Sequence, residues 1–333
     1  MDYEENEVAR VFLVSDQIYK KGIKKDVMKT VMVIMSTYNG EKFIQEQIDS
    51  ILNQINCCTK IYVRDDGSTD RTVEILDDYK QRGLIDYCVG ENLKPAKSFL
   101  TALLDCERAD YYAFSDQDDI WEKDKLYSAI CMLEKMPDKK VPILYCSNLK
   151  VINSNKSVLK EKLLPDEIVM DYEQLLVRSP HIFGCTEVFN NELYNIIKKN
   201  GVPKNLIMHD LWVALIAASC GNIIYDSDAH IKYRQHENNH TGATETPLKV
   251  WKNRMQVIRH KLPWSIADQA TEFIEYIGND TLRKNGKLRY TQMVSGYKKS
   301  LKKMFIYIKN FKHDSMNKKQ YAFHVLMIFM NRL

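Results

Sequence analysis

The sequence lacks a run of about 18 uninterrupted apolar residues, so we expect no membrane-spanning helix. Residues 1–7 are acidic and lack an apolar signal core, which argues against an export signal. The eight cysteines include no Cys-x-x-Cys pair, so the sequence indicates neither a zinc site nor a disulfide framework. Reduced thiols are typical of the cytoplasm, where we expect the protein to act.

A strong charge of one sign is also missing from the chain as a whole. The formal net charge of the 333 residues is +4, which argues against a general polyanion binder. We also find no nucleic-acid recognition module. Hydrophobic residues make up 45% and charged residues 28% of the chain, which is ordinary for a soluble protein of one large or two modest domains.

The first half of the chain alternates between β-type apolar runs and helical patterns. Buried strands are predicted at residues 31–36, 60–64, 85–89 and 111–114. Helices are predicted from residue 41, from about residue 69 and at 97–107. This alternation implies right-handed crossovers and a mainly parallel α/β sheet, whose ligands bind beyond the carboxyl ends of the strands.

The second half of the chain is less regular. Strands are expected at 143–147, 149–152, 184–189, 222–225 and 229–234, with a helix at about 209–219. After Pro247 the pattern is helical to the end, with breaks near Pro263 and Gly278. Residues 1–29 form a polar leader, in which we expect a short helix near 8–20.

Polar segments follow three of the predicted strands at their carboxyl ends: residues 37–40, 65–70 and 115–119. The third contains Asp116, Asp118 and Asp119, which repel one another unless a cation or solvent compensates. A divalent metal bound to a substrate diphosphate would supply that cation, because Mg²⁺ and Mn²⁺ take carboxylate and phosphate oxygens. The alternatives are a solvated, helix-capping turn at 115–119 and a helix-initiating turn at 65–70.

These segments and a fourth carry a family resemblance. Thr-Tyr-Asn-Gly at 37–40, Asp-Asp-Gly-Ser-Thr-Asp at 65–70, Ser-Asp-Gln-Asp-Asp at 115–119 and His-Asp-Leu-Trp at 209–212 occur in that order. Together they resemble glycosyltransferase family 2, which has the GT-A fold, and its bacterial branch that makes surface polysaccharides. The resemblance covers about residues 30–242 and implies a GT-A catalytic domain there, while the residue pattern indicates a polar leader at 1–29 and a helical, basic C-terminal region at 243–333.

The resemblance also implies the donor side of a site. Thr37 and Tyr38 would lie beside the nucleotide of a sugar donor. Asp66, assisted by Asp65, would bond the base through a charge-assisted hydrogen bond. Asp116 would bond the ribose or help the metal. The form of residues 115–121 is similar to rhamnosyltransferases that use dTDP-rhamnose, and UDP-hexose enzymes share it.

The resemblance assigns metal binding and the chemical step to other residues. Asp118 would be the ligand of Mg²⁺ or Mn²⁺. Asp119 would be a further metal ligand, a hydrogen-bond acceptor for a group that binds the metal, or the cap of the following helix. Asp210 resembles the catalytic base of an inverting transfer, although it also suits the dipole of its own helix. In the polar loop that closes over the donor, Arg234 would pair with the diphosphate and His236 would reach the metal or diphosphate.

The chain departs from processive polysaccharide synthases, because it has no Gln-x-x-Arg-Trp motif. We therefore expect transfer of a single sugar to a hydroxyl of a glycan or lipid-linked acceptor. Two alternatives are a sugar-phosphate nucleotidyltransferase and an inactive GT-A-fold assembly partner. The first would show a Gly-rich basic loop after the first strand, whereas residues 38–41 are acidic and contain one glycine.

The C-terminal region concentrates positive charge. Residues 283–319 carry twelve basic residues against one acid, Asp314, a local balance of +11. An apolar stripe at helical spacing is interleaved with them: Tyr297, Leu301, Met304, Phe305, Ile308 and Phe311. This pattern indicates either a helix on an anionic membrane, where a lipid-linked acceptor would lie, or a helix packed on the catalytic domain with a solvated basic face.

Overall fold

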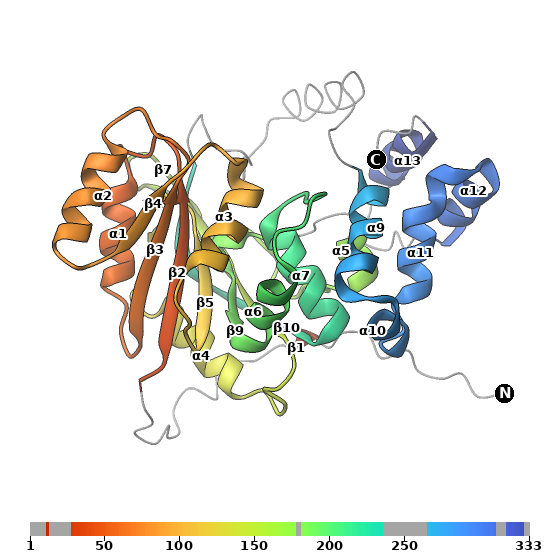
Figure 1. The fold of residues 1–333 in the computed structure, drawn as a ribbon, viewed down its shortest axis with the longest axis horizontal. Coiled ribbons are helices and arrows are strands. Elements are labelled where there is room, and N and C mark those ends of the chain that lie inside the picture. Colours follow the sequence, from red (N-terminus) through yellow and green to blue (C-terminus); the bar gives the residue numbers. More distant parts are fainter. Residues whose placement is uncertain (1–10, 13–27, 178–180, 236–264, 311–317, 330–333) are drawn as a thin grey trace.

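A computed structural model describes residues 11–12, 28–177, 181–235, 265–310 and 318–329. Ten strands of these residues form one mixed sheet in the order β1-β10-β7-β9-β5-β2-β3-β4, with β6 paired to β10 and β8 paired to β7. Helices cover both faces of the sheet, and the C-terminal helices gather at one side of it (Figure 1).

The predicted parallel half of the sheet is confirmed. β2 (Thr30–Thr37) lies between β3 (Cys58–Asp65) and β5 (Tyr111–Ser115), and β4 (Asp86–Val89) extends the sheet beside β3, all in parallel register. The crossover helices are α1 (Ile44–Leu52), α2 (Thr72–Gln81) and α3 (Lys94–Asp105).

Burial on both faces explains why β2 is a continuous apolar run. Met32 and Ile34 belong to the hydrophobic cluster under α3, α6 (Asn191–Asn200) and α7 (His209–Cys220). Val33 and Met35 belong to the opposite cluster, under α1, α2 and α4 (Lys125–Glu134). Side chains of a strand alternate between faces, so a strand covered on both sides has no polar face.

The second half of the sheet differs in detail from the prediction. Residues 143–153 form one strand, β7 (Ile143–Asn153), and residues 222–235 form one long strand, β10 (Asn222–Gln235). β10 keeps its parallel pairing with β7 through register shifts on either side of Ala229, so its two predicted parts are one bulged strand. β6 (Ile120–Trp121) pairs antiparallel with β10, and β8 (Val158–Lys160) with β7.

Two predictions of local structure were wrong. Residues 184–186 are not strand but a 3₁₀ turn, η2 (Gly184–Thr186), and only β9 (Val188–Asn190) pairs, antiparallel to both β5 and β7. In the leader, Val11–Phe12 form β1, a strand parallel to β10, where we had expected helix. Pairing with β10 overrides the local helical pattern at Val11–Phe12, whereas residues 184–186 stay outside the sheet ladder despite their strand-like pattern.

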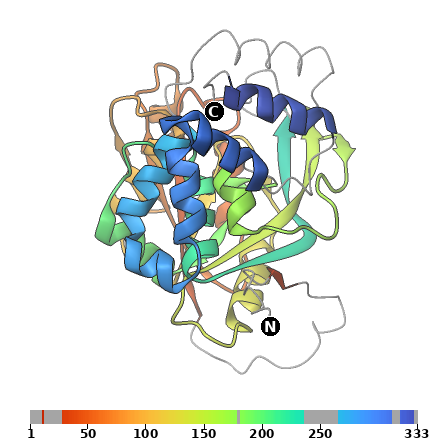
Figure 2. The ribbon, with the colours of Figure 1, turned by 90° about the vertical axis from the view of Figure 1, so that its right-hand side faces the viewer.

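The C-terminal helices are α9 (Ile266–Ile277), α10 (Asn279–Lys284), α11 (Leu288–Gly296), α12 (Leu301–Asn310) and α13 (Lys318–Phe329), with the 3₁₀ turn η3 (Tyr297–Lys299) before α12. They stack together beside α5 (Tyr172–Val177) and α7 (Figure 2). The ring of Trp212 in α7 packs edge-on against Phe273 at 5.3 Å and Tyr276 at 5.1 Å. The helical region therefore shares one hydrophobic core with the sheet domain.

The predicted break at Gly278 is confirmed, since its φ of +89° lies in the region that favours glycine. Within the described residues, no helix has both the length and the apolar character needed to cross a bilayer.

Candidate active site

The polar loops after β2, β3 and β5 are tied together at the carboxyl edge of the sheet. The side chain of Gln117 accepts hydrogen bonds from Thr37 Oγ1 at 2.5 Å and from the backbone N–H of Tyr38 at 2.9 Å. Asn39 donates its N–H to Ser68 Oγ at 2.8 Å, which links the first loop to the second. Thr37 is buried and Tyr38 is half exposed, so the first loop presents an aromatic ring to solvent beside the site.

Asp65 organises the turn after β3. Its Oδ1 accepts from the N–H groups of Gly67 at 3.0 Å and Ser68 at 2.7 Å, and its Oδ2 accepts from Ser68 Oγ. Gly67 has a φ of +80°, a conformation that a side chain would strain. The helix-initiating turn that we weighed for 65–70 is therefore present, and the nucleotide role of Asp65 stays a prediction.

Asp66 is buried and accepts hydrogen bonds from several protein groups. Its Oδ1 receives Arg64 and Ser98 Oγ, the latter at 2.7 Å, and its Oδ2 receives the N–H of Leu93 at 3.1 Å. An ionised carboxylate offers about four lone-pair sites, so one more donor, such as a base N–H, can be accommodated. The role of Asp66 in binding the base stays a prediction.

The acidic loop after β5 buries its carboxylates together. Asp119 is fully buried and its Oδ2 has no hydrogen-bond partner, while its Oδ1 accepts the N–H of Arg234 at 3.0 Å. Burial, followed by the charges of Asp118 and Asp210, raises the pKa of half-buried Asp116 to about 7. Burial, followed by the charges of Asp118 and Asp116, raises the pKa of Asp119 well above its usual range.

This cluster fits a divalent cation. One ligand atom from each of Asp116, Asp119 and Cys185 lies within 4.8 Å of the others. The unpartnered Asp119 Oδ2 and the raised carboxyl pKa values show that the buried negative charge is poorly compensated by the protein. A bound cation would neutralise that charge. Asp118, the predicted ligand, lies between Asp116 and Asp119 in the sequence but is not one of the three residues that come together here, and the predicted ligand His236 lies outside the described residues.

Asp210 stands in the first turn of α7, near the acidic loop, as predicted. Its Oδ2 accepts the N–H of Gly184 at 3.2 Å and its Oδ1 accepts the N–H of Leu211 at 2.7 Å. Burial raises the pKa of Asp210 to about 6, although these backbone hydrogen bonds act in the opposite direction. A carboxylate with such a pKa is ionised at neutral pH and is basic enough to take a proton from a reacting hydroxyl.

His209 shapes the site and carries no charge. Its ring stacks on Phe99 at 4.0 Å and meets Phe114 edge-on at 4.8 Å, and burial lowers the pKa of His209 to about 3. A Cβ on Gly184 would lie 2.6 Å from His209 Nε2, so only glycine lets the 3₁₀ turn approach α7 this closely.

Sequence reasoning missed two buried ionisable side chains near the cluster. Lys125 is fully buried with its Nζ 3.7 Å from the centre of the Trp121 ring, and burial lowers the pKa of Lys125 to about 8. Glu187 is also fully buried, and burial followed by the charge of Asp210 raises the pKa of Glu187 well above its usual range. Lysine and glutamate are rarely buried, and neither residue lies in a motif that would have indicated its burial.

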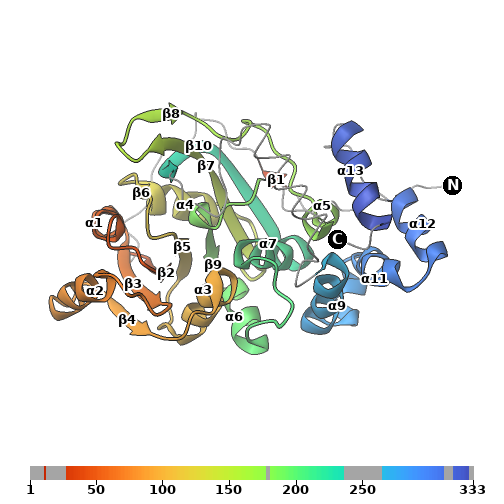
Figure 3. The ribbon, with the colours of Figure 1, turned by 90° about the horizontal axis from the view of Figure 1, so that it is seen from above.

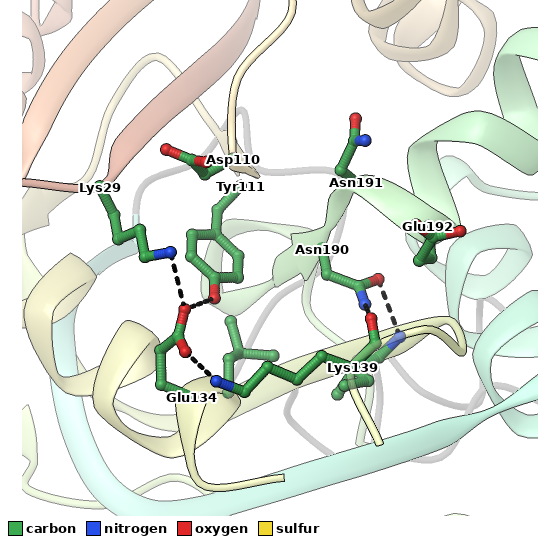
Figure 4. Close-up of a pocket in the computed structure, with 10 residues that line it drawn as sticks. Lys29, Asp110, Tyr111, Glu134, Lys139, Asn190, Asn191 and Glu192 are labelled. Atoms are coloured by element: carbon green, nitrogen blue, oxygen red, sulfur yellow. Dashed lines mark hydrogen bonds and ion pairs between the residues drawn. The ribbon is translucent and has the colours of Figure 1, made fainter. Parts of the chain in front are cut away.

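A surface pocket of about 190 Å³ lies elsewhere (Figure 4). It is lined by residues that begin the parallel strands, such as Lys29 and Tyr111, and by Glu134, whose Oε1 lies 3.2 Å from Lys29 Nζ and accepts the Tyr111 hydroxyl at 2.6 Å. The carboxylate loops follow the opposite ends of these strands, so this pocket is separate from the candidate active site.

Comparison with known proteins identifies the class of enzyme. Residues 32–189 match the model of glycosyl transferase family 2. The chain is 30% identical over 249 residues to dTDP-rhamnosyl transferase RfbG of Shigella flexneri, covering 68% of this chain and 80% of that protein. It is also 30% identical over 201 residues to UDP-Glc:alpha-D-GlcNAc-diphosphoundecaprenol beta-1,3-glucosyltransferase WfgD of Escherichia coli, covering 58% of this chain and 74% of that protein.

The chain belongs to glycosyltransferase family 2, and it is a glycosyltransferase of bacterial polysaccharide synthesis, as the motifs predicted. A solved structure supports the GT-A fold. The mannosyltransferase PcManGT from Pyrobaculum calidifontis, in complex with GDP-Man and Mn²⁺, aligns over 91% of this chain and 85% of its own with a TM-score of 0.50 and 15% identity. Family membership sets aside the nucleotidyltransferase alternative.

The raised pKa of Asp210 predicts that the residue lowers stability. Its carboxyl binds protons more tightly in the folded state, so folding is weakened above about pH 6 and recovers as the pH falls toward 4. We expect Asp210→Asn to raise the free energy of unfolding at pH 8 by about 2–3 kcal/mol. Urea unfolding at pH 8 and pH 5 should show this gain shrinking at the lower pH. An equal loss of stability at both values would contradict the assignment.

Proposed function

We propose that the enzyme moves one sugar, with inversion, from dTDP-rhamnose or a UDP-hexose to a hydroxyl of a glycan or lipid-linked acceptor. The observation that carries the proposal is the convergence of Asp116, Asp119 and Asp210 from two separate elements into one buried acidic cluster. The names of the relatives support the donor and acceptor classes, because RfbG is a dTDP-rhamnosyl transferase and WfgD uses UDP-Glc and a diphosphoundecaprenol-linked glycan.

The donor would lie across the tied loops at the carboxyl edge of the sheet. Thr37 and Tyr38 would flank the nucleoside, Asp66 with Asp65 would hold the base, and Asp116 would bond the ribose or the metal. Gln117 is hydrogen-bonded to the first loop, and the first loop is hydrogen-bonded to the second. This supports the arrangement, because a preorganised site loses little entropy on binding.

Mg²⁺ or Mn²⁺ would be held by Asp118, helped by Asp116 and Asp119, with His236 as a further ligand. When bound, the ion neutralises the charge that develops on the leaving diphosphate. Arg234 remains a candidate contact of that diphosphate.

Asp210 would accept the proton of the acceptor hydroxyl as the oxygen attacks the anomeric carbon. The new C–O bond forms on the face opposite the breaking bond to the nucleoside diphosphate, so one displacement inverts the configuration. The N–H groups of Gly184 and Leu211 hold the carboxylate in place for this step.

We also propose that the C-terminal helices contact an anionic membrane surface from the cytoplasmic side. Part of the predicted stripe is packed inside, because Tyr297 and Met304 are buried. Leu301 and Phe305 are instead 71% and 58% exposed, and Phe305 meets the half-exposed Phe329 of α13 edge-on at 5.9 Å. Exposed lysines stand beside these side chains in η3 and α12: Lys299, Lys302, Lys303 and Lys309. Exposed apolar side chains with lysines nearby in the same helix suit an anionic bilayer interface.

A thermal-shift screen tests the donor and metal. A bound ligand stabilises the folded state by mass action, so the correct nucleotide sugar should raise the melting temperature, and more so with Mn²⁺. We expect Asp118→Ala to abolish the Mn²⁺-dependent part of the shift and to keep the part due to the nucleotide alone. A full Mn²⁺-dependent shift in Asp118→Ala would refute the ligand assignment.

The role of Asp210 is tested by separating binding from transfer. We expect Asp210→Asn to bind the donor as the wild type does and to lose transfer by about 100-fold or more, because an amide cannot accept the proton. Radiolabelled sugar transfer and calorimetric donor binding measure the two properties. A fully active Asp210→Asn enzyme would sink the proposal.

Membrane contact is tested with vesicles of phosphatidylcholine that contain phosphatidylglycerol at about 30%. The wild type should sediment with them at low salt, and Leu301→Ser with Phe305→Ser should reduce the bound fraction several-fold by removing buried apolar area. The matched control is Val158→Ser with Leu159→Ser, which removes two exposed apolar side chains of β8. Equal loss in both double variants would contradict a specific patch.

A further inference from the structure

Arg234 is a buried residue that joins the acidic loop to two other segments, α1 and the turn between β7 and β8. It lies near the end of β10 and is only 1% exposed. Its backbone N–H donates to Asp119 Oδ1 at 3.0 Å, and its Nε donates to the carbonyl oxygen of Asp118 at 2.8 Å. One residue therefore fixes both the side chain of Asp119 and the backbone of Asp118.

The same guanidinium group reaches α1 and the turn between β7 and β8. Nη2 donates to Glu46 Oε2 at 2.5 Å, and Nη1 donates to the carbonyl oxygen of Ser154 at 3.3 Å. Its central carbon lies 4.5 Å from the centre of the Phe43 ring, which precedes α1. Glu46 also pairs with Lys156 of the same turn.

α1 continues this support along the acidic segment. The amide of Gln47 lies 2.7 Å from Ser115 Oγ, and the N–H of Trp121 donates to Ser50 Oγ at 3.0 Å. Gln54 then bonds the carbonyl oxygen of Glu122 at 2.7 Å. β6 lies beside α1 (Figure 3). Because α1 directly follows the loop after β2, it connects that loop to the acidic loop after β5.

The planar fork of arginine suits this position. It offers five N–H donors in fixed directions, and here they meet a carboxylate and two carbonyl oxygens from three different segments. A lysine ammonium has three donors on a single nitrogen, so it cannot reach three segments that are spaced for the nitrogens of a guanidinium group. A diphosphate that took over the guanidinium would have to displace Glu46, which carries the balancing negative charge.

We propose that Arg234 is a positioning residue, with Glu46 as its counter-ion, and that it fixes the metal-binding loop against α1 instead of contacting the diphosphate. This inference rests on the proposed function of the acidic loop. It predicts that Arg234 and Glu46 act as a unit, so that losing either has the same consequence. A diphosphate contact predicts the opposite for Glu46, whose removal would release the guanidinium for the donor.

The decisive variants are Glu46→Gln, Arg234→Lys and Arg234→Met, measured for kcat, donor KM and calorimetric Mn²⁺ binding. Positioning predicts that all three lose roughly tenfold or more in kcat and in Mn²⁺ affinity, with donor KM changed by less than about threefold, since the loss lies in geometry and not in donor contacts. Arg234→Lys should therefore not restore kcat or Mn²⁺ affinity. The double variant should lose no more than the single ones, because the residues act together.

Two results would overturn the inference. One is a Glu46→Gln enzyme with unchanged or lower donor KM beside an Arg234→Met enzyme with a KM raised tenfold. The other is recovery of kcat and Mn²⁺ affinity in Arg234→Lys, which would show that the charge alone is needed. The matched control pair is Arg82→Met and Asp78→Asn, whose exposed ion pair spans 3.2 Å on α2 and should leave all three quantities unchanged.

Hydrogen exchange separates failure of this inference from failure of the proposed function. Peptides that cover residues 115–122 should exchange faster in Glu46→Gln and in Arg234→Met, while peptides of β2 keep their protection. That result supports positioning even if no sugar donor is turned over. Unchanged exchange at 115–122 in both variants would refute it, whatever the activity.

Discussion

Mutual repulsion of buried carboxylates is the constraint on which this structure depends. Asp116, Asp119 and Asp210 share a region of low dielectric, where burial raises the pKa of each, and neighbouring acids raise the pKa of Asp116 and Asp119 further. Such a cluster costs stability unless protons or a cation neutralise it. The ammonium group of Lys125 offsets part of this negative charge, although burial lowers the pKa of Lys125. The folded protein therefore retains repulsion between buried carboxylates, which a metal ion bound together with a diphosphate-bearing donor would relieve.

Rigid surroundings keep these charges from moving apart. Gln117 clamps the acidic loop to the first donor loop, and Arg234 clamps it to α1 and to the β7–β8 turn. On the other side, Gly184 and α7 fix Asp210. The C-terminal helices pack against Trp212 of α7 through Phe273 and Tyr276, so the proposed base Asp210 lies on a helix that is packed on both sides. Site geometry is thus maintained by packing far from the chemistry.

The sequence predicts the parallel half of the sheet well, because strands such as β2 are buried on both faces and carry a continuous apolar run. Motif order led to Asp116 and Asp210, and the structure brings them together. Contacts between distant segments were beyond reach: Gln117 meets Thr37, and Arg234 meets Glu46, only after the chain has folded. The 3₁₀ turn at Gly184 and the bulge in β10 were missed for a related reason, since tertiary pairing decides them and no local pattern encodes them.

The most direct test of the electrostatic account is the number of protons released when Mn²⁺ alone binds at pH 7. Titration calorimetry in buffers of different ionisation enthalpy gives that number. Because the pKa of Asp116 is raised to about 7, a saturating cation should displace roughly half a proton or more, and Asp116→Asn should release fewer. Mn²⁺ binding without any proton release would mean that the carboxylates do not share the cation, and it would contradict the account.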